Sequence, residues 1–174
     1  MENSEIRSLM ASYNEIDGVP SHANGWLLND VLRGEWGFKG GVVSDYWGID
    51  DLVRLHGVEP DMEAAAVRAL KAGVDFDLPD GNAFKLLPDA LEKGLVTEEE
   101  IDTAVRRMLE IKFLSGMFED PYADAAYAEE ITDNADARAL AEEAARKSIV
   151  LLKNDGVLPL DRGAFGKIAV IGPN

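Results

Sequence analysis

The stretch Gly40-Gly41-Val42-Val43-Ser44-Asp45-Tyr46-Trp47 decides the fold of this chain. A glycine-led, β-branched run before a turn is typical of a buried parallel strand. Asp45 stands at the carboxyl end of that run, where β/α folds place their chemistry. By position alone, capping of the next helix is the favoured role for this carboxylate. The stretch therefore predicts a β/α fold and leaves a structural and a catalytic role open for Asp45.

Strands and helices are predicted to alternate around this stretch. The predicted order is strand, helix, strand, helix, strand, helix, over residues 9–13, 24–34, 40–45, 61–73, 74–78 and 83–92. Thr97 and Glu100 then form a capping-box pattern for a helix that runs to Gly116. Such alternation indicates right-handed crossovers and a parallel sheet. Three strands do not close a barrel, but they fit the last three units of an eight-stranded β/α barrel of roughly 250 residues.

The pattern changes after residue 118. Residues 119–134 are rich in alanine and acidic residues and show little periodicity, so we predict a linker there. An alanine-rich helix is predicted over 135–147. Residues 167–172 have the pattern of a buried strand at the end of the chain. Residues 135–174 are therefore expected to begin a second α/β domain, and the chain to be one part of a longer protein.

The charge and composition exclude several kinds of partner and chemistry. The 174 residues include 33 acidic and 17 basic side chains, which give a formal net charge of −16. That balance disfavours nucleic acids and anionic membranes as partners, although solubility alone also accounts for it. The absence of cysteine excludes disulfides and thiolate sites. No apolar run approaches the roughly 18 residues of a membrane span. No signal peptide is visible, which slightly favours the cytoplasm.

Seven segments carry a resemblance to a known family. They are MASYN at 10–14, DGVP at 17–20, LRGEWGFKG at 32–40, VVSDY at 42–46, AGVD at 72–75, AARKSIVLLKN at 144–154 and LPL at 158–160. In this order they resemble glycoside hydrolase family 3. The resemblance implies a retaining, exo-acting β-glycosidase with a β/α (TIM-type) barrel followed by an α/β sandwich domain. Residues 1–118 would then hold the last three barrel units, 119–134 the linker, and 135–174 the first strand of the sandwich domain.

The same resemblance implies that Asp45 is the catalytic nucleophile. Retaining hydrolysis uses two carboxyl groups about 5–5.5 Å apart, one as nucleophile and one as acid/base. The family supplies its acid/base glutamate from the second domain, downstream of this chain. No glutamate in the chain is therefore assigned to that role, and the isolated chain is expected to be inactive.

Three further residues are implied to contact substrate. Tyr13 and Met10 match family positions near the first sugar, with core packing as their alternative role. Strict alternation would point these two side chains to opposite faces, so a strand end or bulge is expected between them. Tyr46 follows the nucleophile where the family more often has tryptophan, at the next subsite. His22 is expected to form its hydrogen bonds within its own loop.

The sequence therefore predicts part of a β-glucosidase-like enzyme that hydrolyses terminal non-reducing β-D-glucosyl residues of small β-glycosides or oligosaccharides. A β-D-xylosidase of the same family is the alternative, and a non-catalytic interaction module derived from a barrel is an alternative of another class. No cofactor is expected. No metal is expected either, because the spacing of Asp45, Asp50 and Asp51 matches no EF-hand loop and the resemblance implies no metal. The sequence does not predict the oligomeric state.

Overall fold

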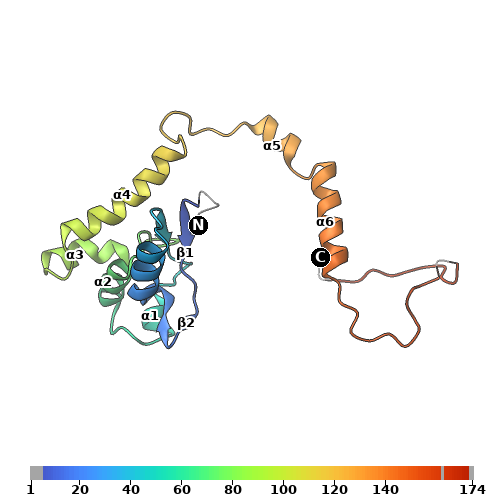
Figure 1. Cartoon of the computed structure of the whole chain (residues 1–174), viewed down its shortest axis with the longest axis horizontal. Coiled ribbons are helices and arrows are strands. Elements are labelled where there is room, and N and C mark those ends of the chain that lie inside the picture. The colour runs from blue at the N-terminus through green and yellow to red at the C-terminus, as the bar shows by residue number, and fades with distance from the viewer. Residues whose placement is uncertain (1–5, 162, 173–174) are drawn as a thin grey trace. The chain divides into compact units, whose positions relative to one another are not determined.

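The computed structural model describes residues 6–161 and 163–172. The chain divides into two compact units at Pro121, and each is described here by itself (Figure 1). The first unit contains the strands and the buried core of the described residues, whereas the second contains two helices and extended chain.

Parallel strands lie at the centre of the first unit. β1 (Ser8–Met10) pairs in parallel with β4 (Gly41–Val43), with Met10 opposite Val43. Phe76 continues the pattern through a parallel bridge to Val43. The predicted parallel order is confirmed, but the strand predicted over 74–78 is reduced to this bridge.

A hairpin follows β1 and shortens it. The chain leaves the sheet after Ala11, whose N–H donates to the carbonyl of Val43 at 2.9 Å. β2 (Glu15–Ile16) and β3 (Val19–Pro20) then pair antiparallel around Asp17-Gly18, which have φ angles of 51° and 78°. Asp-Gly favours such a turn. The strand predicted over 9–13 is therefore too long at its carboxyl end.

The helix after the hairpin differs in pitch from the prediction. A short 3-10 turn, η1 (Ser21–Ala23), leads into η2 (Trp26–Glu35), which is a π-helix. The residue just before η2 is Gly25, but the predicted cap Asn24 still binds the first turn, because its Oδ1 accepts the N–H of Leu27 at 3.0 Å. The hydrogen bond from Trp36 N–H to the carbonyl of Val31 spans five residues and shows the wide pitch.

The two helices with the clearest sequence signals form as predicted. α2 (Met62–Ala72) begins where Asp61 accepts the N–H of Ala64 at 2.9 Å. It ends at Gly73, which has a φ of 107°. α4 (Glu98–Leu114) begins with the full capping box of Thr97 and Glu100. Local side-chain bonds to orphan backbone groups therefore fix both helices.

Two smaller helical segments complete the first unit. α1 (Asp51–Arg54) is a single turn that the sequence did not predict. The helix predicted over 83–92 is a 3-10 turn, η3 (Phe84–Leu86), followed by α3 (Leu87–Glu92). Pro88 stands at the start of α3, where its missing N–H is no loss.

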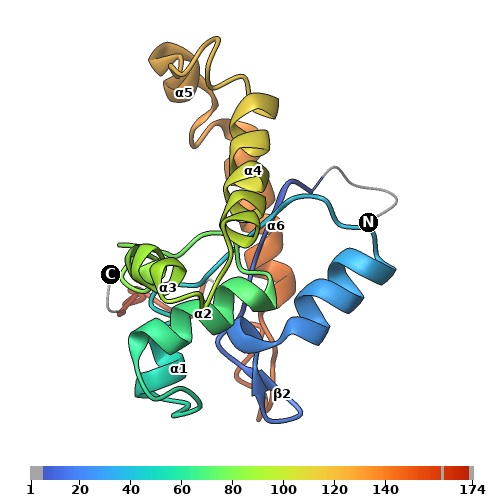
Figure 2. The same cartoon turned by 90° about the vertical axis from the view of Figure 1, so that its left-hand side faces the viewer.

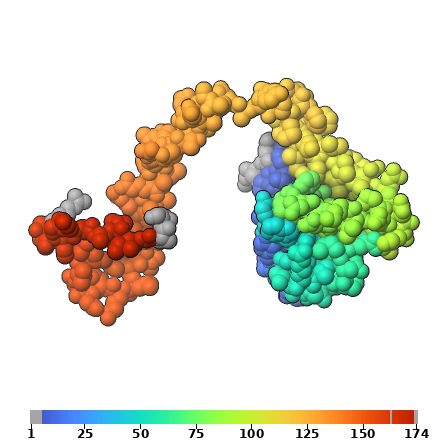
Figure 3. Space-filling model, turned by 180° about the vertical axis from the view of Figure 1, so that it is seen from behind, coloured from blue at the N-terminus to red at the C-terminus, as the bar shows by residue number. Residues whose placement is uncertain are grey.

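α2 is the central helix of the first unit. It packs against η1, η2, α3 and α4, as the turned view in Figure 2 shows. Its inward face is largely alanine, which lets neighbouring backbones approach closely. Helices α1 to α4, from cyan to yellow, form one packed surface in Figure 3. The fully buried apolar side chains include Val42, Ile49, Leu52, Ala65, Ala66, Ala69, Val74, Ala83 and Ala90.

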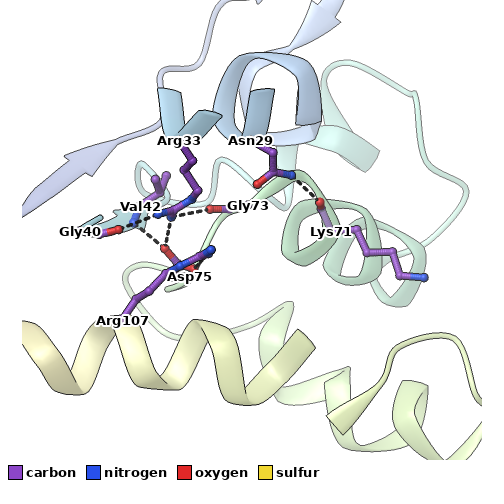
Figure 4. Close-up of polar contacts among 8 residues, drawn as sticks. All are labelled: Asn29, Arg33, Gly40, Val42, Lys71, Gly73, Asp75 and Arg107. Carbon is purple, nitrogen blue, oxygen red and sulfur yellow. Dashed lines mark hydrogen bonds and ion pairs between the residues drawn. The ribbon is translucent and has the colours of Figure 1, made fainter. Parts of the chain in front are cut away.

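A charged cluster joins these elements at the amino end of β4 (Figure 4). The buried carboxylate of Asp75 contacts Nη2 of Arg33 at 2.6 Å and Nη1 of Arg107 at 2.8 Å. It also accepts the N–H of Val42 at 2.8 Å. Arg33 lies on η2, Val42 on β4 and Arg107 on α4. Asp75 therefore connects three elements that are far apart in the sequence.

The second unit departs from two predictions. α5 (Ala125–Ile131) forms inside the predicted linker, because Asp124 accepts the N–H groups of Ala126 and Tyr127. α6 (Ala135–Ser148) forms as predicted, with Asn134 as its cap. Residues 167–172 are extended but form no strand among the described residues. A strand needs a neighbour to accept its hydrogen bonds, and every described side chain of this unit is exposed.

Candidate active site

Asp45 lies two residues after the end of β4, and it is partly exposed. Its Oδ1 accepts the N–H of Tyr46 at 2.8 Å, and its own N–H donates to Nε2 of His22 at 3.1 Å. A carboxylate is therefore held at the carboxyl end of a parallel strand, which is the edge that β/α folds use for catalysis.

A tight turn after Asp45 places the next two aromatic residues. Gly48 N–H donates to the carbonyl of Asp45 at 3.0 Å, and Trp47 N–H donates to the carbonyl of Leu78 at 3.0 Å. Trp47 has a φ of 56°, a left-handed conformation that costs a non-glycine residue about 1–3 kcal/mol. Strain of this kind persists where the surrounding structure imposes it, and it clusters at functional sites.

Tyr13 and Tyr46 lie beside the carboxylate. The hydroxyl of Tyr13 donates to the carbonyl of Tyr46 at 2.7 Å. Desolvation, followed by hydrogen bonding to Asp45 and its charge, raises the pKa of Tyr13, so its phenol stays protonated at neutral pH. The side chains of Tyr46 and Trp47 are 51% and 44% exposed, and their rings meet edge to face. Exposed aromatic faces next to a carboxylate suit the C–H faces of a sugar.

Met10 is placed differently from the other candidates. β1 ends at Met10, so the strand end expected between Met10 and Tyr13 is present. The side chain of Met10 is 58% exposed and lines an apolar hollow of about 170 Å³ with Leu27 and Trp36. The structure thus brings Tyr13 into contact with the turn that contains Asp45 and Tyr46, while Met10 lies on the adjacent strand.

The contact between His22 and Asp45 was not predicted. The expectation that His22 forms its hydrogen bonds within its own loop is wrong, because its Nε2 accepts the N–H of Asp45, beyond the end of β4. Burial lowers the pKa of His22 to about 4, against the opposing charges of Asp45 and Asp51. His56 also lowers the pKa of His22. The imidazole is therefore neutral at neutral pH, with its proton on Nδ1.

We expect His22 to make stability depend on pH. The unfolded chain protonates His22 below about pH 6.5, whereas the folded chain does so only below about pH 4. The neutral His22 ring therefore makes its full contribution to the free energy of unfolding above pH 6.5. That contribution falls by about 3 kcal/mol in total as the pH drops to 4. Urea unfolding at pH 7 and pH 4.5 should show a smaller loss for His22→Gln than for the wild type. Equal losses in both proteins would contradict the expectation.

Comparison with known proteins identifies the family. The sequence model of the glycosyl hydrolase family 3 N-terminal domain matches residues 1–111. The chain belongs to glycosyl hydrolase family 3. The N-terminal domain of this family is of the β/α-barrel type, in agreement with the parallel strands described above.

Individual family 3 proteins are similar over most of the chain. A periplasmic beta-glucosidase of Salmonella typhimurium is 44% identical over 172 residues, which are 95% of this chain and 22% of the relative. A putative beta-xylosidase of Formosa agariphila is 41% identical over 177 residues, which cover 99% of this chain and 23% of the relative. The crystal structure of a Listeria innocua beta-glucosidase in complex with glucose is 36% identical, with a TM-score of 0.74 over 87% of this chain and 21% of that one. The chain thus spans about a fifth of the length of these relatives.

Two other buried acidic residues of this family 3 chain, Asp50 and Asp77, make contacts within the fold. Asp50 is buried and lies 3.2 Å from Nη2 of Arg54. Asp77 accepts the N–H groups of Ala83 and Phe84, in the loop that follows its strand position. Within residues 6–161 and 163–172, no group of three or more histidine or acidic side chains is placed to hold a metal ion. No helix in the same residues is long and apolar enough to cross a bilayer.

Proposed function

We propose that this chain is part of a retaining, exo-acting β-glycosidase that removes terminal non-reducing β-D-glucosyl residues, with Asp45 as its nucleophile. The single observation that carries the proposal is the partly exposed Asp45 carboxylate at the end of β4, in a family 3 chain. Relatives named as beta-glucosidases support the glucoside class.

In the proposed reaction, a carboxylate oxygen of Asp45 attacks the anomeric carbon. The glycosidic bond breaks, and its oxygen leaves with a proton from the acid/base group, which we place outside this chain. Water then attacks the same carbon, gives its proton to that group, and releases Asp45 as a carboxylate. Two displacements at one carbon retain the β configuration.

Tyr13 and Tyr46 have supporting roles in this proposal. The protonated Tyr13 phenol would exchange its hydrogen bond to the carbonyl of Tyr46 for one to the Asp45 carboxylate or to the sugar. Tyr46 offers an exposed ring for the leaving group. Met10 would contact the first sugar from the adjacent strand. Because the hydroxyl of Tyr13 contacts the turn that contains Asp45 and Tyr46, the substrate is expected to bind over that turn.

The same proposal extends to the domain organisation. Residues 1–118 would supply the last three units of the barrel, 119–134 the linker, and 135–174 the beginning of an α/β sandwich domain. Residues 167–172 would then become a strand when the other strands of that domain are available to pair with them. The exposed side chains of Val170 and Ile171 support this proposal, since both are apolar and suited to a sheet interior.

Kinetics with nitrophenyl β-D-glucoside and β-D-xyloside test the substrate class. We expect the full-length protein to favour the glucoside about tenfold or more in kcat/KM, because a glucose pocket also binds the C6 hydroxymethyl group. NMR should show the β anomer as the first sugar released. A preference for xyloside would instead support the beta-xylosidase alternative, which the similarity to the Formosa agariphila protein favours. No turnover of either substrate would favour a non-catalytic module.

A further inference from the structure

The imidazole of His22 lies against the part of the chain that holds Asp45. His22 belongs to η1, and its side chain is 1% exposed. Its Nε2 accepts the Asp45 N–H at 3.1 Å, and its ring centre lies 6.3 Å from that of Tyr13. Two members of the proposed site therefore contact or approach one buried ring.

Close packing at Gly48 holds this ring in place. A Cβ atom at Gly48 would lie 2.3 Å from both Cε1 and Nε2 of His22, so no other residue fits there without a shift of the ring. On its other side, η1 is anchored by Ser21, whose N–H and Oγ both donate to the carbonyl of Asn14. The ring is thus fixed between the hairpin and the turn that follows Asp45.

The hydrogen bond requires one protonation state. Nε2 can accept only when it carries no proton, so the proton must be on Nδ1. The titratable groups that act on the ring are Asp45, Asp51 and His56, and Nδ1 of His56 lies 2.8 Å from Oε1 of Glu15. Burial lowers the pKa of His22 more than the charges of Asp45 and Asp51 raise it. Nε2 therefore stays unprotonated and able to accept a hydrogen bond at neutral pH.

The backbone position of Asp45 determines where its carboxylate lies. Oδ1 accepts the N–H of the next residue, so the side chain is oriented by its own turn. A displacement of the reacting group by about 1 Å can cost roughly a hundredfold in rate. A buried acceptor that fixes the Asp45 N–H therefore also fixes the attacking oxygen.

We propose that His22 is a positioning residue for Asp45, and that it acts by accepting the Asp45 N–H through Nε2. The inference rests on the proposed role of Asp45 as nucleophile. His22 touches no reacting atom in this account, and its effect is on the formation of the glycosyl-enzyme rather than on sugar binding.

A matched pair of variants of the full-length protein tests the proposal. His22→Phe keeps a ring but removes the acceptor, whereas the amide oxygen of His22→Gln can replace Nε2. The measurements are the rate at which a fluorinated glucoside labels Asp45 and the affinity for glucose. We expect His22→Phe to lower the labelling rate about 10- to 100-fold with little change in affinity, and His22→Gln to recover most of the rate. Gly48→Ala should resemble His22→Phe, because it displaces the ring.

The outcomes separate this inference from the proposed function. Normal labelling of Asp45 in His22→Phe, or equal losses in the Phe and Gln variants, would overturn the positioning role alone. A label on another residue would overturn the proposed nucleophile. Nitrogen-15 NMR of the wild-type protein decides the case if the variants do not fold. A proton on Nδ1 of His22 that persists to about pH 5 supports the role, and a proton on Nε2 overturns it.

Discussion

Asp45→Ala is expected to abolish hydrolysis by the full-length protein, with kcat lower by about a thousand- to a million-fold. Without the carboxylate, no covalent intermediate can form. The fold should survive, because the side chain is partly exposed and its hydrogen bond to Tyr46 lies within one turn. The measurements are kcat on an activated glucoside and the midpoint of urea unfolding.

Chemical rescue distinguishes a nucleophile from a structural carboxylate. Azide is small enough to occupy the space that the Asp45 side chain leaves in Asp45→Ala. It would attack from the same face and release an α-glycosyl azide, since only one displacement then occurs. Asp80→Ala is the matched control, because Asp80 is an exposed acid just beyond the neighbouring strand position. We expect this control to keep its activity within about threefold. A fully active Asp45→Ala protein would refute the assignment.

Local signals account for the parts of the fold that the sequence predicts well. α2 and α4 begin and end where their caps indicate, because each cap satisfies backbone groups within one turn. The parallel pairing of β1 and β4 also follows from the sequence, since alternating strands and helices permit few topologies.

The missed features depend on contacts between distant residues or on missing partners. Neither the π-helical pitch of η2 nor the left-handed backbone of Trp47 has a recognisable sequence signal. The hydrogen bond from Asp45 to His22 joins two loops that come together only through the sheet. The pattern at 167–172 encodes a strand that needs neighbours, and none is present among the described residues.

The candidate site rests on resemblance more than on position. Position alone favoured a capping role for Asp45, and the surrounding VVSDY segment changed that interpretation. The structure places Tyr13 against the turn that contains Asp45 and Tyr46, which alternation along a strand does not establish. His22 was misassigned because a buried histidine at a distance leaves no pattern in a single sequence.

Asp75→Ala is expected to destabilise the protein by about 3–5 kcal/mol, the cost of breaking a buried ion pair. The carboxylate has a side-chain exposure of 1% and forms ion pairs with both Arg33 and Arg107. Burial lowers the pKa of Arg33 while Asp75 opposes that effect, so the unpaired guanidinium would be costly. Urea unfolding measures the loss. Glu63→Gln is the control, because its partner Lys93 is largely exposed, and it should cost at most about 1 kcal/mol.

Further variants at this cluster show whether the instability of Asp75→Ala comes from the lost hydrogen bond to Val42 or from the arginines left without a partner. Asp75→Asn keeps an acceptor for the N–H of Val42 but carries no charge to pair with either arginine. It should therefore recover only a small part of the free energy of unfolding that Asp75→Ala loses. Adding Arg33→Met and Arg107→Met to Asp75→Leu should recover most of it, because no buried cation then remains. If the triple variant is as unstable as Asp75→Ala, the cluster acts through the Val42 bond that fixes β4. Because Asp45 lies two residues after β4, that result would make Asp75 a determinant of the site as well as of the fold.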